Sequence, residues 1–164
     1  MDSIVIARAP VHINLSGDTY HALDPKACSG QMMISAAIGY YVYTIINRNP
    51  LREIQIVTAG QDGPIRSAWP KDTQADPPTT LPEAIVNHFN IQEGLTIFLA
   101  FQIPTGAGLG ACGSLAVSMV KSLAFCSGLD LDKKDVAGLA CYLKDEHLDL
   151  AIGRLEDPYA AAYG

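Results

Sequence analysis

Pro104-Thr105-Gly106-Ala107-Gly108-Leu109-Gly110-Ala111-Cys112-Gly113-Ser114 is the stretch that decides the fold of this chain. It follows an apolar run, Leu95 to Ile103, that favours a strand, and it leads into an apolar segment, Leu115 to Phe125, that favours a helix. Glycines permit positive φ and let backbone N–H groups come close to a ligand. The next helix directs unpaired N–H groups and its positive dipole end toward the loop. The stretch therefore predicts a phosphate site, in preference to a tight turn without a ligand.

Two common phosphate motifs do not fit this loop. A Walker A loop needs a lysine after its last glycine, whereas Gly113 is followed by Ser114-Leu115. Gly108 to Gly113 has the G-x-G-x-x-G spacing of a dinucleotide site, but that site needs a strand after the helix. Here Leu129 to Lys134 leads into another helix, so both readings are set aside.

The rest of the chain indicates one α+β domain, with strands in the first half and helices in the second. The expected strands are residues 4–7, 11–15, 32–46, 53–58 and 95–103, with a break at Pro10. The expected helices are a segment capped by Thr80 that runs to Phe89, then residues 115–125, a helix from Asp130 or Asp132 to Leu148, and residues 156–163. Residues 16–31 and 59–80 are expected to be irregular.

Composition excludes several classes of protein. The 164 residues are 49% hydrophobic and 17% charged, with a net charge of −6, which argues against a nucleic-acid partner. No apolar stretch is long enough for a membrane span, and Met1 to Ile4 does not begin a signal peptide. None of the four cysteines forms a C-x-x-C pair, which favours a reducing cytoplasm. They are Cys28, Cys112, Cys126 and Cys141.

Pro104 to Gly110 resembles the glycine loop of the GHMP kinases, which include galactokinase, homoserine kinase, mevalonate kinase and the heptose-phosphate kinases. Arg8-Ala9-Pro10-Val11-His12-Ile13-Asn14-Leu15-Ser16-Gly17 is similar to the N-terminal substrate motif of the family. Gly153 to Gly164 resembles a segment of its heptose and related sugar kinases, as does Ser35-Ala36-Ala37-Ile38. The resemblance thus spans the chain, and the glycine loop is its most specific part.

The resemblance implies a fold like the second domain of ribosomal protein S5, with a mixed or antiparallel sheet packed against helices. It also implies that the glycine loop holds the phosphates of ATP. The residues concerned are Pro104, Gly106, Ala107, Gly108, Leu109, Gly110, Ala111, Cys112, Gly113 and Ser114. The catalytic carboxylate of the family corresponds to Asp157, which would orient or deprotonate a substrate hydroxyl. Asp157 could also cap a helix that begins at Pro158, and both roles remain open.

A magnesium ion is also implied, with Glu146 as one ligand, although a solvated helix face explains Glu146 equally well. The family usually has serines after the last loop glycine, and the second helps to bind the metal. Here Ala111-Cys112-Gly113 stands instead, and a thiol is a poor ligand for Mg²⁺. Ser114 is therefore the expected substitute, although it is displaced along the helix.

Substrate contacts are implied for Arg8, His12, Gly17 and Asp18, within a loop that extends from Ser16 to Thr19. Many members have Lys or Arg where this chain has His12, and histidine gives a weaker, pH-dependent positive charge. Cys112 at a helix N-terminus could be a nucleophile, but no local motif pairs it with a histidine. A small buried residue in the serine position is the favoured interpretation of Cys112.

These features predict an ATP- and Mg²⁺-dependent kinase, a phosphotransferase with an alcohol acceptor, that acts on a sugar, sugar phosphate or related small molecule. Residues 1–164 correspond to its N-terminal, ATP-binding domain, and the C-terminal domain of the family lies outside this chain. The surface that such a domain covers would be apolar and could support a homodimer. The alternative is a non-catalytic binding or assembly module on the same scaffold, which the loss of the loop serines favours.

Overall fold

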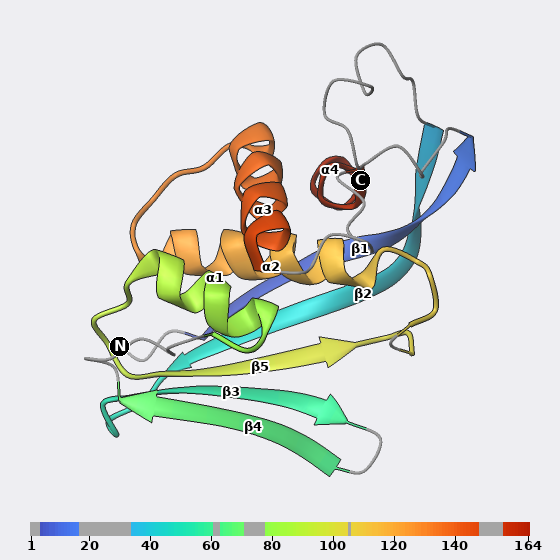
Figure 1. The fold of residues 1–164 in the computed structure, drawn as a ribbon. Helices are drawn as coiled ribbons and strands as arrows, with labels where there is room; N and C mark the ends of the chain where they lie inside the picture. Colours follow the sequence, from blue (N-terminus) through green and yellow to red (C-terminus); the bar gives the residue numbers. More distant parts are fainter. Residues whose placement is uncertain (1–3, 17–33, 61–62, 71–77, 105, 148–155) are drawn as a thin grey trace.

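The computed structural model describes residues 4–16, 34–60, 63–70, 78–104, 106–147 and 156–164. In this part of the chain, a five-stranded sheet carries helices on one side (Figure 1). The strands are β1 (Val5–Ser16), β2 (Ile34–Arg48), β3 (Glu53–Gly60), β4 (Gly63–Pro70) and β5 (Leu95–Phe101). The helices are α1 (Leu81–Phe89), α2 (Ala111–Cys126), α3 (Lys133–His147) and α4 (Glu156–Tyr163). None of these helices is long and apolar enough to cross a bilayer.

The sheet has the order β1-β2-β5-β3-β4. Only β3 and β5 run parallel, while the other neighbouring strands are antiparallel. This arrangement confirms the expected α+β class with a mixed sheet. Since β5 is central and leads into the glycine loop, the loop emerges from the middle of the sheet at the edge where β3 also ends.

The predicted break of the first strand at Pro10 is wrong. β1 continues through Pro10, because it is an edge strand and a proline there does not need to donate to a neighbour. The register with β2 shifts between Pro10 and His12. Consecutive residues of a regular strand face opposite sides, but at this irregularity Val11 and His12 are both buried. The shift thus directs His12 into the interior.

The predicted irregular connection over residues 59–80 is also wrong in part. β4 forms a hairpin with β3, from Gly60 opposite Gly63 to Glu53 opposite Pro70. The prolines at the ends of β4 indicated a loop, but β4 is the other edge of the sheet, where prolines are tolerated. Pairing with β3 supplies the backbone hydrogen bonds that the local sequence did not predict.

Helix α1 begins as predicted. The Thr80 hydroxyl accepts a bond from the Glu83 N–H at 3.4 Å, and the Glu83 carboxylate accepts one from the Thr80 N–H at 3.1 Å. This reciprocal capping box satisfies two backbone donors at the helix start. At α3, the Asp132 carboxylate accepts a bond from the Asp135 N–H, which fixes the start of that helix near one of the two predicted positions.

Helix α2 is the centre of the helical layer and packs against β1, β2 and the other three helices. It begins at Ala111, earlier than predicted, because Gly110 in the left-handed region ends the loop and serves as N-cap. Small residues on α2 allow close packing on the sheet, where the Ser118 and Thr44 hydroxyls are 2.8 Å apart and fully buried. The N-terminus of α2 is therefore held firmly against the sheet.

Candidate active site

The glycine loop joins the end of β5 to the start of α2. Gly106, Gly108 and Gly110 have φ values of 81°, 72° and 71°, which glycine adopts without strain. A Cβ at Gly106 or Gly108 would point into open space, and the loop backbone there is exposed. Helix α2 has neither a side-chain cap nor an acidic residue in its first turn. The loop and the positive end of the helix together form a cradle suited to an anion.

β1 is fastened to this cradle through His12. The His12 backbone N–H donates to the Leu109 carbonyl at 3.1 Å, and the imidazole lies directly against the α-carbon of Gly110. Any side chain at Gly110 would overlap that ring. The His12 side chain is 2% exposed, and its Nδ1 has no hydrogen-bond partner among the residues that the structure describes. One buried polar atom therefore lies beside the cradle without a hydrogen bond in the described part of the chain.

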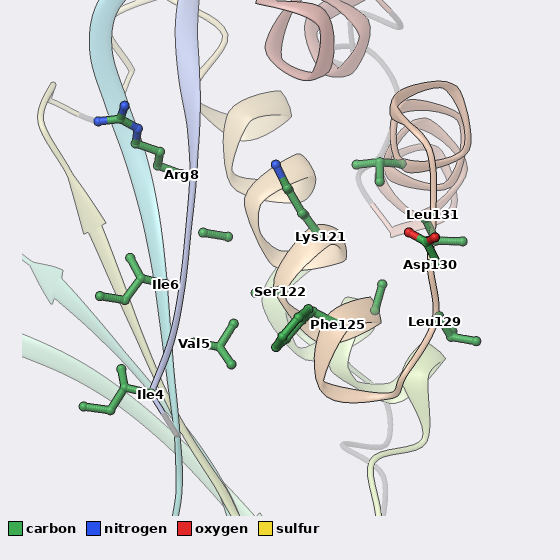
Figure 2. Close-up of a pocket in the computed structure, with 13 residues that line it drawn as sticks. Ile4, Val5, Ile6, Arg8, Lys121, Ser122, Phe125, Leu129, Asp130 and Leu131 are labelled. Carbon is green, nitrogen blue, oxygen red and sulfur yellow. The ribbon is translucent and has the colours of Figure 1, made fainter. Parts of the chain in front are cut away.

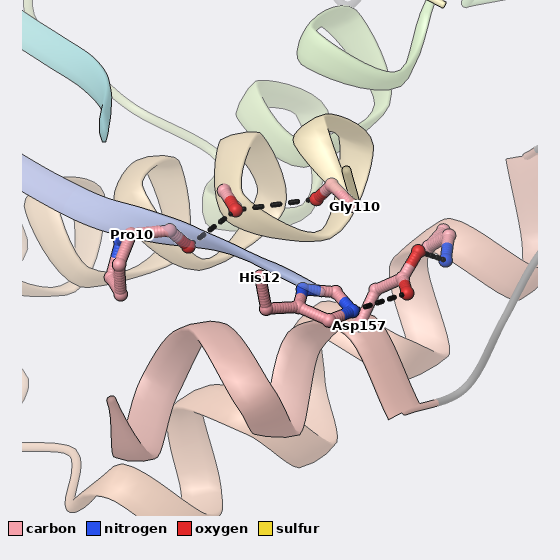
Figure 3. Close-up of polar contacts among 6 residues, drawn as sticks. Pro10, His12, Gly110 and Asp157 are labelled. Carbon is pink, nitrogen blue, oxygen red and sulfur yellow. Dashed lines mark hydrogen bonds and ion pairs between the residues drawn. The ribbon is translucent and has the colours of Figure 1, made fainter. Parts of the chain in front are cut away.

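Asp157 lies in the first turn of α4, and its Cβ packs against Gly113 of α2. Its Oδ1 is 3.1 Å from Nε2 of His12, close enough for an ion pair but without hydrogen-bond geometry (Figure 3). Its Oδ2 accepts a bond from Nζ of Lys144 at 3.4 Å. Since α4 begins at Glu156, Asp157 lies inside the helix, and its carboxylate pairs with side chains of β1 and α3.

The charge of Asp157 is stabilised by these neighbours. Burial by itself raises the pKa of Asp157, but the contact with His12 and the charge of Lys144 outweigh it. The pKa therefore lies below its ordinary value of 3.8, and the carboxylate is ionised at neutral pH.

Lys144 was missed by the sequence analysis. Its neighbours Asp145, Glu146 and His147 indicated a solvated helix face, yet the Lys144 side chain is 2% exposed. Helical spacing could have found it, because Ala140 follows the buried Ala137 by three residues and Lys144 follows the buried Ala140 by four.

Each of the two predicted magnesium ligands has another partner in the structure. Ser114 is fully buried, and its hydroxyl donates to the Pro10 carbonyl at 2.7 Å, with the Gly110 carbonyl at 3.2 Å (Figure 3). Glu146 is exposed and hydrogen-bonds Tyr142, an interaction that raises the pKa of that tyrosine. In the described part of the chain, no three His, Cys, Asp or Glu side chains cluster to hold a metal ion. The magnesium site stays a prediction.

The predicted substrate residues are only partly placed. Gly17, Asp18 and Thr19 lie outside the residues that the structure describes, as does Thr105 of the loop. Arg8 is not with the cradle: its guanidinium lies 4.4 Å from the centre of the Tyr41 ring. His12 is thus the described residue of the substrate motif that reaches Asp157.

Arg8 also borders a hollow of about 740 Å³ between β1, the second half of α2 and the segment before α3 (Figure 2). This hollow lies at the end of α2 opposite to the glycine loop. Its apolar residues include Val5, Phe125 and Leu131. No predicted site residue other than Arg8 borders it.

The expectation that Cys112 is buried is wrong. Gly113 faces Asp157 at the crowded side of α2, so the preceding Cys112 turns toward solvent and is exposed as a free thiol. The absence of a side chain at Gly113 is what lets α4 approach this closely.

Comparison with known proteins finds similarity to several small-molecule kinases. The family model of the GHMP kinases N terminal domain matches residues 80–164, which confirms the resemblance. D-glycero-alpha-D-manno-heptose 7-phosphate kinase of Campylobacter jejuni is 36% identical over 62 residues, 38% of this chain and 18% of that protein. The 4-diphosphocytidyl-2-C-methyl-D-erythritol kinase of Limosilactobacillus reuteri is 28% identical over 138 residues, 84% of this chain and 46% of that protein.

A solved structure shows the same fold. A D-glycero-D-manno-heptose 1-phosphate kinase from Bacteriodes thetaiotaomicron superposes with a TM-score of 0.81 at 21% identity, over 99% of this chain and 54% of that chain. The chain spans less than half the length of the curated relatives given above.

Proposed function

Since this chain belongs to the GHMP kinase family through its N terminal domain, we propose that it is the ATP-binding half of a kinase that phosphorylates a hydroxyl of a sugar, sugar phosphate or similar small molecule. One observation supports this most directly. An open glycine cradle at an uncapped helix N-terminus lies next to a buried, ionised carboxylate, Asp157. A polyphosphate tail and a hydroxyl nucleophile are the two groups that such a pair can hold.

The cradle would hold the phosphates of ATP through the backbone N–H groups of Gly106 to Gly113. ATP would supply the phosphoryl group. The backbone N–H groups at the positive end of α2 would stabilise the negative charge that develops on it. These groups are already oriented, so they need little rearrangement when the charge appears.

Asp157 would then bind and orient the acceptor hydroxyl. A carboxylate with a lowered pKa is a weak base, so orientation and charge stabilisation should contribute more than complete removal of the proton. That role agrees with phosphoryl transfer, in which positioning and electrostatics provide most of the rate.

The acceptor class follows from the relatives, whose names specify a heptose 7-phosphate, a diphosphocytidyl methylerythritol and galactose. All three are small molecules with several hydroxyls. Among the residues that the structure describes, Cys112, Cys126 and Cys141 form no disulfide, which agrees with a reducing cytoplasm, where ATP is available.

The direct test is ATP consumption by the full-length protein with galactose, the heptose 7-phosphate, diphosphocytidyl methylerythritol and mevalonate. Asp157→Asn should lower kcat by about 100-fold or more, because a neutral amide lacks the negative charge that orients the hydroxyl and stabilises its partial positive charge. ATP binding, measured by calorimetry, should change much less. Absence of turnover with every acceptor, together with absence of ATP binding, would contradict the proposal.

A non-catalytic binding module is the second candidate. Ala111-Cys112-Gly113 stands where the family usually has serines, and the Ser114 hydroxyl is held by the Pro10 carbonyl. This candidate predicts little or no Mg·ATP binding by the unmodified protein. Cys112→Ser should then raise the Mg·ATP affinity if the thiol is the defect, and calorimetry on both proteins separates the two functions.

A further inference from the structure

Lys144 is among the most deeply buried side chains of the described residues, and its ammonium lies 3.4 Å from Oδ2 of Asp157. Burying a lysine is costly, and the cost is offset only when a negative charge and hydrogen bonds replace the lost water. A buried ion pair is often no more stabilising than apolar side chains of the same size. Apolar side chains could therefore hold α4 against α3 as well as this ion pair does.

The position of the Lys144–Asp157 pair suggests a role in the candidate active site instead. Asp157 has His12 of β1 on one carboxylate oxygen and Lys144 of α3 on the other (Figure 3). Gly113, in the first turn of α2, supports the Cβ of the same aspartate. Three separate elements therefore fix where the carboxylate lies relative to the glycine cradle. A group held in this way loses little freedom when a substrate binds.

The two partners of Asp157 contact its carboxylate in different ways. Nε2 of His12 lies closer to the carboxylate, at 3.1 Å, but without hydrogen-bond geometry. Lys144 donates a bond to the other oxygen at 3.4 Å, so α3 supplies a hydrogen bond that β1 does not.

We propose that Lys144 is a positioning residue of the phosphoryl-transfer site, whose ammonium keeps the Asp157 carboxylate charged and directed toward the glycine cradle. This inference rests on the kinase function proposed above. The charge of Lys144 is one cause of the lowered pKa of Asp157, as expected for such a role. It also explains why a lysine is buried on a helix whose next residues are acidic.

Lys144→Met removes the charge and keeps most of the length of the side chain. Lys134→Met is the matched control, because Lys134 is an exposed lysine of the same helix. In the full-length protein, the titration of the Asp157 carboxyl, followed by carbon-13 NMR, should move up by about one pH unit in Lys144→Met. With the acceptor that ATP consumption identifies, kcat should fall at least about tenfold while KM for ATP changes little. Lys134→Met should change neither.

Moving the positive charge from position 144 to position 12 distinguishes a positioning role of Lys144 from a purely structural one. In the double variant His12→Lys with Lys144→Met, the new lysine can reach Asp157 from β1, so the titration should move back down and most of kcat should return. A structural role of Lys144 would not be rescued from another element. Circular dichroism checks folding, and Lys144→Gln replaces the methionine variant if that protein does not fold.

The proposal is overturned if Lys144→Met leaves the Asp157 titration and kcat unchanged, or if the folded double variant recovers neither. If the unmodified protein phosphorylates no acceptor and binds no ATP, the kinase function fails. The NMR titration then still decides whether Lys144 sets the charge of Asp157, so the two failures can be told apart.

Discussion

Gly110 is the residue at which the cradle and the first strand meet. Its φ of 71° and the imidazole of His12 against its α-carbon leave no room for a side chain. Gly110→Ala should therefore destabilise the protein by at least about 2 kcal/mol, through backbone strain and overlap. Gly108→Ala is the control with a similar φ but open space, and it should cost about 1 kcal/mol. Urea unfolding of both variants measures the difference.

Gly108 should matter for a different property. A methyl group there would project from the exposed loop, where the phosphates are expected, so Gly108→Ala should weaken ATP binding more than it destabilises the fold. Calorimetry with ATP gives the affinity. Equal ATP affinity in Gly108→Ala and the unmodified protein would place the phosphates elsewhere.

Asp157 should make the free energy of unfolding depend on pH in the acidic range. Its pKa is lower in the folded than in the unfolded chain, so folding favours the ionised form. This contribution is complete above the unfolded value, near 3.8, and is lost as the pH falls through the lower folded value. The free energy of unfolding should thus decline on acidification more steeply than in Asp157→Asn, when both are measured between neutral pH and pH 3. Parallel curves would show that Asp157 has no such role.

Among single elements, α1 offers a simple test of local stability. The capping box of Thr80 and Glu83 satisfies backbone donors that would otherwise lack partners. Thr80→Ala should lower the free energy of unfolding by about 1 kcal/mol. Thr80→Ser keeps the accepting oxygen and should cost much less. Similar losses in the two variants would mean that the hydroxyl does not act as the cap.

Some elements could be predicted from local sequence and others could not. The strand before the glycine loop, the cap at Thr80 and the last helix depend on neighbouring residues, and the structure confirms them. β4 depends on pairing with β3, and the continuity of β1 through Pro10 depends on its place at the sheet edge. Sheet position is a tertiary property, which a local pattern of prolines and glycines does not reveal.

In the candidate site, too, some residues could be predicted from the sequence and others could not. The resemblance brought His12, Gly110 and Asp157 into one hypothesis, and the structure places them in contact. Lys144 was missed because its charged sequence neighbours suggested exposure. The side of a helix that is buried is decided by what packs against it, here α2 and α4.

At the scale of the whole molecule, ATP should stabilise the folded domain, because only the folded chain has the cradle. At a ligand concentration 100 times Kd the gain is about 2.7 kcal/mol, which corresponds to a Tm increase of roughly 5–10 °C for a chain of this size. AMP, which lacks the β- and γ-phosphates, is the matched control and should give a smaller shift. Equal shifts would mean that the cradle does not bind the polyphosphate.

His12 and Asp157 are in contact, but they lie near opposite ends of the described sequence. The rest of the sheet and the central helix α2 come between them along the chain. A chain that is still being synthesised therefore has its glycine loop long before it has the carboxylate beside it. Contacts between residues so distant in sequence form late in folding, because much of the loop entropy must be lost first. Full nucleotide-dependent protection against proteolysis should appear only once the last helix has docked, so that ligand binding reports the completion of folding.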